Sequence, residues 1–90
     1  MPESVQIQSL FPNPFNPELS ISYALPKDAL TRVVVFNTMG EEVDVILPEQ
    51  MKRSGYHTYY WNAAEQPSGM YFIQVQAGNH VDTQKAILVK

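Results

Sequence analysis

The sequence contains no cysteine, which excludes disulfide bonds, thiolate metal sites and cysteine nucleophiles and leaves the redox compartment open. Charged residues make up only 17% of the 90 residues, and the six basic ones are scattered. Because no basic stripe could follow a phosphate backbone, we expect no nucleic-acid partner. No apolar run is long enough to cross a bilayer, and residues 1–10 lack the charged start and apolar centre of a signal peptide.

The residue groupings that catalysis requires are also missing. Serine, histidine and aspartate occur, but no nucleophile motif, catalytic carboxylate pair or phosphate-binding loop accompanies them. A domain of this length also has little interior for a pocket that excludes water. We therefore expect no enzyme activity, no cofactor, no metal and no small-molecule substrate.

What the chain does contain is short segments of alternating apolar and polar residues, separated by turn signals every 8–12 residues or so. The segment 31–37 is almost continuously apolar and suits a central strand, whereas 48–54 is polar and predicts a loop or one helical turn. This pattern predicts an all-β chain, an immunoglobulin-like antiparallel β-sandwich of about seven strands, forming a single domain over 1–90. Residues 1–4 are interpreted as a linker remnant or an expression start. The predicted strands are 5–10, 19–25, 31–37, 41–47, 56–62, 69–76 and 81–90.

A proline-rich corner, FPNPFNP at 11–17, separates the first two predicted strands. Its prolines fix φ near −65° and push the residues before them out of the helical region, so the segment must be extended and kinked. Phe11 and Phe15 lie within it, and each large apolar side chain gains roughly 1.5–3 kcal/mol from burial. We expect both rings to seal one end of the core.

The segment 56–62 is rich in aromatic residues. Alternation places Trp61 in the core, His57 partly buried beside it, and Tyr56 and Tyr60 on the open face. Exposed aromatic rings bind sugar faces, so a carbohydrate-binding module remains an alternative. The acidic residues Glu41, Glu42 and Asp44 are interpreted as a solvated strand edge that discourages aggregation, with a calcium site as the alternative.

Five motifs in order resemble the C-terminal sorting domains of type IX secretion (type A, Por secretion family). They are FPNPFNP with ISYALP at 11–26, VVVFNTMGEEV at 33–43, GYHTYYWN at 55–62, SGMYF at 68–72 and KAILVK at 85–90. Two turn positions depart from the family pattern, because Ala63 replaces a glycine and Pro67 an apolar residue. The motif residues expected to have structural roles are Pro12, Asn13, Pro14, Phe15, Asn16, Pro17, Gly40, Trp61, Gly69 and Tyr71.

The resemblance implies a function as a secretion address in bacteria of the Bacteroidetes and related phyla. A cargo fused N-terminally would reach the periplasm by its own signal peptide, and the folded domain would direct it across the outer membrane to the cell surface or the medium. The implied partners are an outer-membrane translocon, a shuttle protein and a sortase-like protease that commonly removes the domain. Family likeness places recognition on the last strand, at Lys85, Ala86, Ile87, Leu88, Val89 and Lys90.

A terminal strand suits such a task, because an unpaired edge offers backbone groups that a partner strand can complete. Lys85 and Lys90 would add charge recognition at the rim of that edge. A passive immunoglobulin-like spacer or adhesion module remains the third alternative. The sequence does not reveal the cargo, the cleavage site or the oligomeric state.

Overall fold

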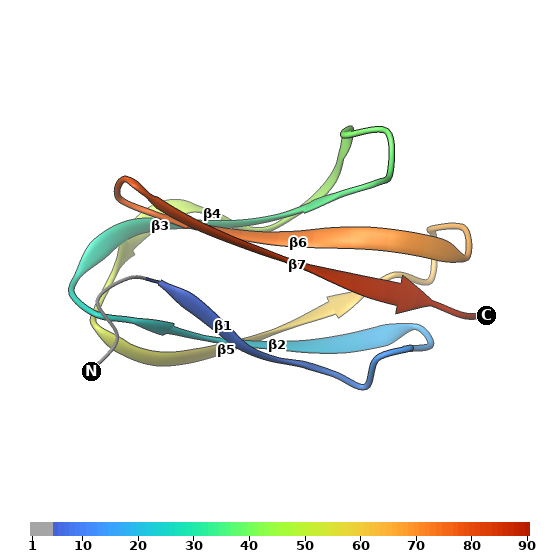
Figure 1. Ribbon diagram of the computed structural model, residues 1–90, viewed down its shortest axis with the longest axis horizontal. Coiled ribbons are helices and arrows are strands. Elements are labelled where there is room, and N and C mark those ends of the chain that lie inside the picture. Colours follow the sequence, from blue (N-terminus) through green and yellow to red (C-terminus); the bar gives the residue numbers. More distant parts are fainter. Residues whose placement is uncertain (1–4) are drawn as a thin grey trace.

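The computed structural model describes residues 5–90, so the interpretation of residues 1–4 lies outside the described part of the chain. The described chain is all-β and contains no helix, hence none that could span a membrane (Figure 1). The strands are β1 (Gln6–Phe11), β2 (Glu18–Leu25), β3 (Ala29–Phe36), β4 (Glu42–Lys52), β5 (Gly55–Asn62), β6 (Gly69–Ala77) and β7 (His80–Leu88).

Two antiparallel sheets pack face to face as a sandwich (Figure 1), which confirms the predicted fold and is consistent with an immunoglobulin-like architecture. One sheet has the order β1-β2-β5 and the other β4-β3-β6-β7. The first strand is therefore at an edge of its sheet, and β7 is at an edge of the other sheet. Both sheets are built from antiparallel ladders, and β6 pairs with β7 without a register shift.

The core fills the space between the sheets with every second residue of the strands. Leu19, Ile21 and Tyr23 of β2 face Val33 and Val35 of β3 and are fully buried. Val34, on the opposite face of β3, is also fully buried, as the continuous apolar run predicts for a central strand.

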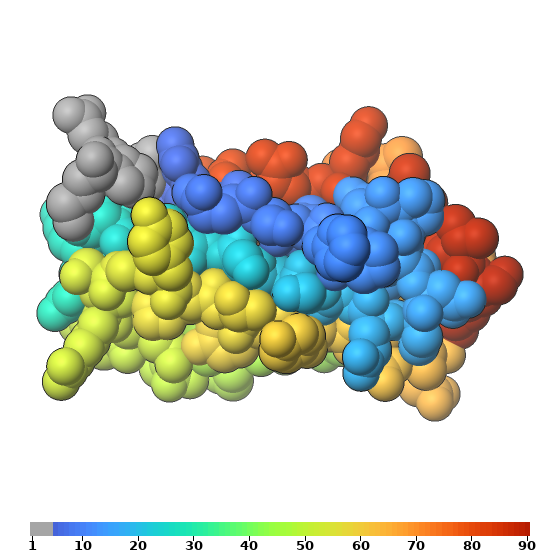
Figure 2. All heavy atoms as spheres, turned by 90° about the horizontal axis from the view of Figure 1, so that it is seen from below, coloured from blue at the N-terminus to red at the C-terminus, as the bar shows by residue number. Residues whose placement is uncertain are grey.

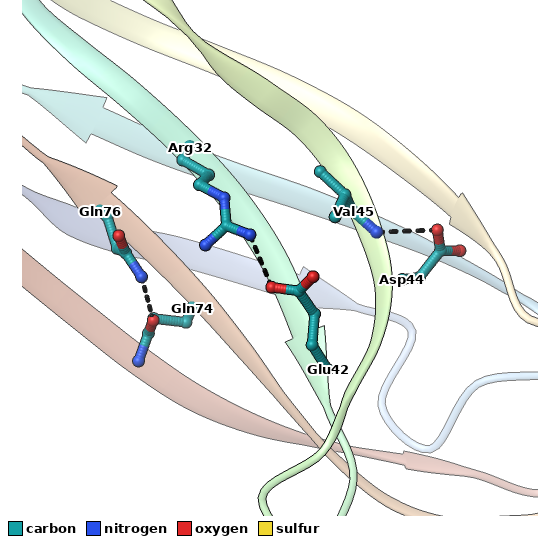
Figure 3. A network of polar contacts seen from close by, with 6 residues as sticks. All are labelled: Arg32, Glu42, Asp44, Val45, Gln74 and Gln76. Atoms are coloured by element: carbon teal, nitrogen blue, oxygen red, sulfur yellow. Dashed lines mark hydrogen bonds and ion pairs between the residues drawn. The ribbon is translucent and has the colours of Figure 1, made fainter.

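Polar side chains lie on the outer face of the four-stranded sheet (Figure 3), where Gln74 is the register partner of Val34. Arg32 forms an ion pair with Glu42 at 2.6 Å, and the Gln76 amide donates to Gln74 at 2.5 Å. The ion pair joins β3 to β4, and the amide hydrogen bond connects two residues of β6. The middle of this face is therefore polar. Toward one end the same face carries apolar residues, since Phe36 pairs with Phe72 and Met70 pairs with Ile87.

The fourth strand is longer than the sequence predicts. Residues 48–52, expected in a loop or helical turn, continue β4 and pair with the start of β3, as in Gln50↔Thr31. Pro48 is tolerated because β4 is an edge strand, where a missing N–H breaks no ladder bond. Strict alternation with the buried Leu47 would turn Val45 inward and Ile46 outward. Irregularities in the β3–β4 register shift the alternation, so Ile46 packs against the core while Val45 is exposed.

The turn between β3 and β4 follows the sequence prediction closely. Gly40 has φ +81°, a conformation that only glycine adopts without strain. The Asn37 carboxamide oxygen accepts from the backbone N–H groups of Met39 and Glu41 at 2.9 and 3.0 Å. A glycine is therefore required here by the backbone, as the motif position suggests.

Candidate functional site

The proline-rich corner lies along the edge of the last strand, and this places the segment 13–15 beside residues 85–89. Phe15 donates its N–H to the Ile87 carbonyl at 2.8 Å and accepts from the Val89 N–H at 3.0 Å. The Asn13 side chain accepts from the Ile87 N–H at 3.0 Å and donates to the Lys85 carbonyl at 3.2 Å. The corner thus acts as a short parallel strand added to β7, with a Phe15↔Leu88 bridge.

The two phenylalanines of the corner have different environments. Phe15 is 2% exposed and seals the end of the core, as predicted. Phe11 is 70% exposed, so the prediction that it also plugs the core is wrong. The reason is its position as the last residue of β1, opposite the outward-facing Ser20, which places its ring on the solvent face of the sheet.

Phe15 is the centre of an aromatic cluster formed by separate motifs. Its ring lies 5.7 Å from that of Trp61, and Trp61 meets Tyr71 edge-on at 5.4 Å. Trp61 is 3% exposed, which confirms its predicted place in the core. The Tyr71 hydroxyl donates to the Pro67 carbonyl at 2.5 Å, and burial raises the pKa of this phenol. Three of the five sequence motifs therefore pack together at one end of the sandwich, beside the fifth.

One partner of this cluster was not anticipated. The Trp61 indole N–H donates to the Asp44 carboxylate at 2.8 Å, which connects β5 to β4 between the two sheets. The sequence reading treated Asp44 as a solvated edge charge because alternation alone does not show what lies across an open side of a sandwich. A buried tryptophan usually finds an acceptor for its N–H. This requirement is the feature of the sequence that points to a nearby acceptor such as Asp44.

The predicted recognition residues divide into three groups. Ala86 and Leu88 are buried and belong to the core, whereas Lys85, Ile87 and Val89 point outward, with Ile87 38% and Val89 51% exposed. Lys90 follows the strand and binds the β5–β6 loop. Its ammonium donates to the Ala64 carbonyl at 2.5 Å, and its N–H to the Ser68 hydroxyl at 3.1 Å. The outward face of the chain end is thus one lysine and two apolar side chains.

The second half of β7 does not have the unpaired edge that a partner strand could complete. The Lys85 carbonyl, both backbone groups of Ile87 and the Val89 N–H are bonded to Asn13 and Phe15. Proline-rich segments are usually pictured as loops, so sequence reasoning did not anticipate that this one would pair with a strand. Between residues 85 and 89 the chain therefore offers side chains rather than backbone groups to a partner.

A second group of rings lies at the far end of the β2–β5 pair. Tyr23 stacks between His57 and Tyr59, with ring centroids 5.4 and 6.0 Å away. The buried hydroxyl of Tyr23 has no hydrogen-bond partner within residues 5–90. Burial is the main cause that raises the pKa of Tyr23, and the neighbouring Tyr59 raises it further. His57 is half-buried and its Nε2 contacts the Arg53 carbonyl at 2.7 Å, which confirms the predicted satisfied histidine.

Figure 2 shows the side of the molecule formed by the three-stranded sheet. Exposed aromatic residues lie on the outer face of this sheet. Tyr56 is 81% and Tyr60 70% exposed, as predicted. The register Phe11↔Ser20↔Tyr60 places Phe11 on the same face as Tyr60, two strands away. Across the described residues, no group of three or more His, Asp or Glu side chains is placed to hold a metal ion.

Comparison with known proteins gives one match. The sequence model of the family described as "Secretion system C-terminal sorting domain" matches residues 9–90, which covers all seven strands except the start of β1. Neither the curated proteins nor the solved structures compared gave a match. The matched family is a family of secretion signals and not of enzymes. The chain therefore belongs to the type IX secretion system C-terminal sorting domains.

Proposed function

We propose that this domain directs an N-terminally fused cargo to the type IX outer-membrane translocon and that recognition is centred on the outward face of the chain end. The cargo would enter the periplasm by its own signal peptide, cross the outer membrane with the folded domain, and reach the cell surface or the medium. The shuttle protein and the sortase-like protease would act on the same domain. The family match supports a sorting role, and the export route and the named partners are part of this proposal.

The observation that carries the proposal is the joining of the first and last motifs. Asn13 and Phe15 hold the backbone of β7 in a fixed register, so that Lys85, Ile87 and Val89 present one ordered row of side chains. A translocon that accepts only folded domains can read such a row, because the row exists only when the proline-rich corner is packed on β7. Exposed apolar side chains bordered by charged ones are typical of protein–protein interfaces.

The first test is export of a reporter. Residues 1–90 are fused to the C-terminus of a periplasmic reporter and expressed in a type IX host and in a translocon-deficient strain of that host. We expect extracellular reporter only in the host with the translocon. Retention of the fusion in the periplasm of both strains would contradict the proposed function and would leave the passive spacer as the better description.

A carbohydrate-binding role is the second candidate, and the exposed rings of Phe11, Tyr56 and Tyr60 favour it. They share one face of the three-stranded sheet, on which the Ser22 and Thr58 hydroxyls are hydrogen-bonded at 3.1 Å. Affinity electrophoresis against plant and microbial polysaccharides tests this role, with Tyr60→Ala as the matched variant. Absence of retardation on every glycan would exclude it, and retardation that Tyr60→Ala abolishes would support it.

A further inference from the structure

The open side of the sandwich between β1 and β7 contains a polar trough. Two adjoining hollows, of about 440 and 330 Å³, share Ile7, Gln8 and Gln84 in their linings and together extend from Val5 to Lys85. In Figure 2 the side chains of β7 emerge beside those of β1 along this side. The two strands share no ladder, and a single side chain bridges them: the Asp82 carboxylate accepts from the Ile7 N–H at 2.7 Å.

The trough exists because the inward face of β7 changes character along the strand. Ala86 and Leu88 are buried in the core, whereas Asp82 and Gln84, at the preceding inward positions, are polar and only partly covered or exposed. The apolar core therefore ends before the start of β7. Amide side chains from β1 and β7 line the space instead, and each amide both donates and accepts hydrogen bonds.

The backbone of β7 along the trough has free hydrogen-bonding capacity. Odd-numbered residues of this strand turn their N–H and C=O groups away from β6, as the bonds of Ile87 to Asn13 and Phe15 demonstrate. Because the β6–β7 register is regular, Val81 and Thr83 must turn theirs outward as well. Within residues 5–90, no hydrogen bond occupies these outward groups, in contrast to the half of the strand that the corner covers.

We propose that this trough receives an extended polypeptide strand of the secretion machinery, which pairs with β7 at Val81 and Thr83 in line with the Asn13–Phe15 segment. The inference rests on the proposed function, since it names how the partner binds. The chain's own corner already occupies the neighbouring stretch of the same edge as an added strand, and the incoming strand continues it. The polar lining favours a peptide backbone over the apolar face of a helix.

Thr83→Pro and Thr83→Val form the matched pair that tests this inference. Proline removes the outward N–H of residue 83 and crowds the edge, but it breaks no bond to β6, because the N–H of residue 83 does not face that strand. Valine changes the side chain and keeps the N–H. In the reporter fusion we expect export to fall by about tenfold with Thr83→Pro and by less than about twofold with Thr83→Val.

The outcomes separate this inference from the proposed function. If the wild type is exported and both variants are exported equally well, the proposed strand binding in the trough is overturned and the sorting function stands. If the wild type is not exported, both proposals are overturned. A second measurement tests the same inference without proline, in case the Thr83→Pro variant fails to fold.

Because the chain has no cysteine, Thr83→Cys and Tyr56→Cys each introduce a single thiol.

Maleimide labelling of these two thiols is compared for the domain alone and for the domain bound to detergent-solubilised translocon. We expect labelling at position 83 to slow by about tenfold in the complex and labelling at position 56 to stay unchanged, because only the first lies beside the paired edge. Equal rates at position 83 in both states overturn the inference. Slow labelling at 83 in the concentrated domain alone would assign the edge to a second copy of this chain and overturn it too.

Discussion

The side chain of Asn13 is hydrogen-bonded to the backbone N–H of Ile87 at 3.0 Å, across 74 positions of sequence. Its amide nitrogen also donates to the carbonyl of Lys85 at 3.2 Å. One asparagine thereby occupies an acceptor and a donor position that a neighbouring strand would supply. This contact holds the proline-rich corner against the last strand.

Removal of this side chain should destabilise the domain measurably. We expect Asn13→Ala to lower the free energy of unfolding by about 1–2 kcal/mol, because two hydrogen bonds to β7 are lost at a partly solvated site. Asn16→Ala is the matched control from the same corner, since the Asn16 side chain makes no hydrogen bond within residues 5–90, and it should change the value by less than about 0.5 kcal/mol. Equal effects in urea denaturation would contradict the assigned role of Asn13.

The two corner phenylalanines provide a second comparison. Phe15→Leu should lower stability by about 1–3 kcal/mol, because the buried ring contacts Trp61 and leucine leaves part of its space empty. Phe11→Leu should change stability by less than about 0.5 kcal/mol, since that ring is largely in solvent. The midpoint of thermal unfolding reports both. A larger loss for Phe11→Leu would show that the corner packs differently.

The fold could be predicted from sequence because the alternation of β2, β5 and β6 records which face each residue occupies. Prediction failed where alternation is interrupted. The irregular β3–β4 register reversed Val45 and Ile46, and periodicity has no means to locate such an irregularity. Phe11 was misplaced for a related reason, because a hydrophobic residue at the end of a strand can face either side of the sheet.

The candidate site was only partly accessible from sequence. The outward positions Lys85, Ile87 and Val89 follow from strand period, but their support comes from Asn13, which no local pattern links to β7. The Asp44–Trp61 bond is equally non-local. Contacts that join distant segments through side chains leave no periodic trace in one sequence, so they were found only in the structure.

The Asp44–Trp61 hydrogen bond gives a third prediction. Asp44→Ala should lower stability by about 1–3 kcal/mol, because the buried indole N–H loses an ionised acceptor. Asp44→Asn keeps an acceptor oxygen at nearly the same position and should recover at least half of the loss. Trp61 is the only tryptophan, so its fluorescence follows unfolding directly. Identical stability of Asp44→Ala and the wild type would exclude the bond as a contributor.

The buried phenol of Tyr23 predicts a loss of stability at alkaline pH. Burial raises its folded-state pKa above the ordinary value of 10.0 that it regains on unfolding. The neutral Tyr23 phenol therefore contributes fully to the free energy of unfolding below pH 10. This contribution is lost as the pH rises beyond 10, by about 1 kcal/mol at pH 11. Tyr23→Phe should make this decline shallower without abolishing it, since the Tyr71 pKa is raised too, and should not lower stability at pH 7.

Urea denaturation at pH 8, 10 and 11 measures this dependence. Tyr56→Phe is the control, because Tyr56 is exposed and its hydroxyl makes no hydrogen bond within residues 5–90. The control should follow the wild-type decline at every pH. A Tyr23→Phe variant with the full wild-type decline would show that another group causes it.

Recognition on the outward face of the chain end is tested without deleting the strand, because deletion of 85–90 would remove the buried Ala86 and Leu88 and unfold the domain. The triple variant Lys85→Ala, Ile87→Ala and Val89→Ala changes only side chains that point outward. The control is Phe11→Ala, Tyr56→Ala and Tyr60→Ala on the opposite sheet. Both triples should unfold within a few degrees of the wild type.

The most direct measurement is the extracellular fraction of a reporter that carries each triple in a type IX host. We predict that the chain-end triple loses most of its export, by about tenfold or more, since the partner reads those side chains. The aromatic triple should be exported like the wild type. Normal export of the folded chain-end triple would contradict the account.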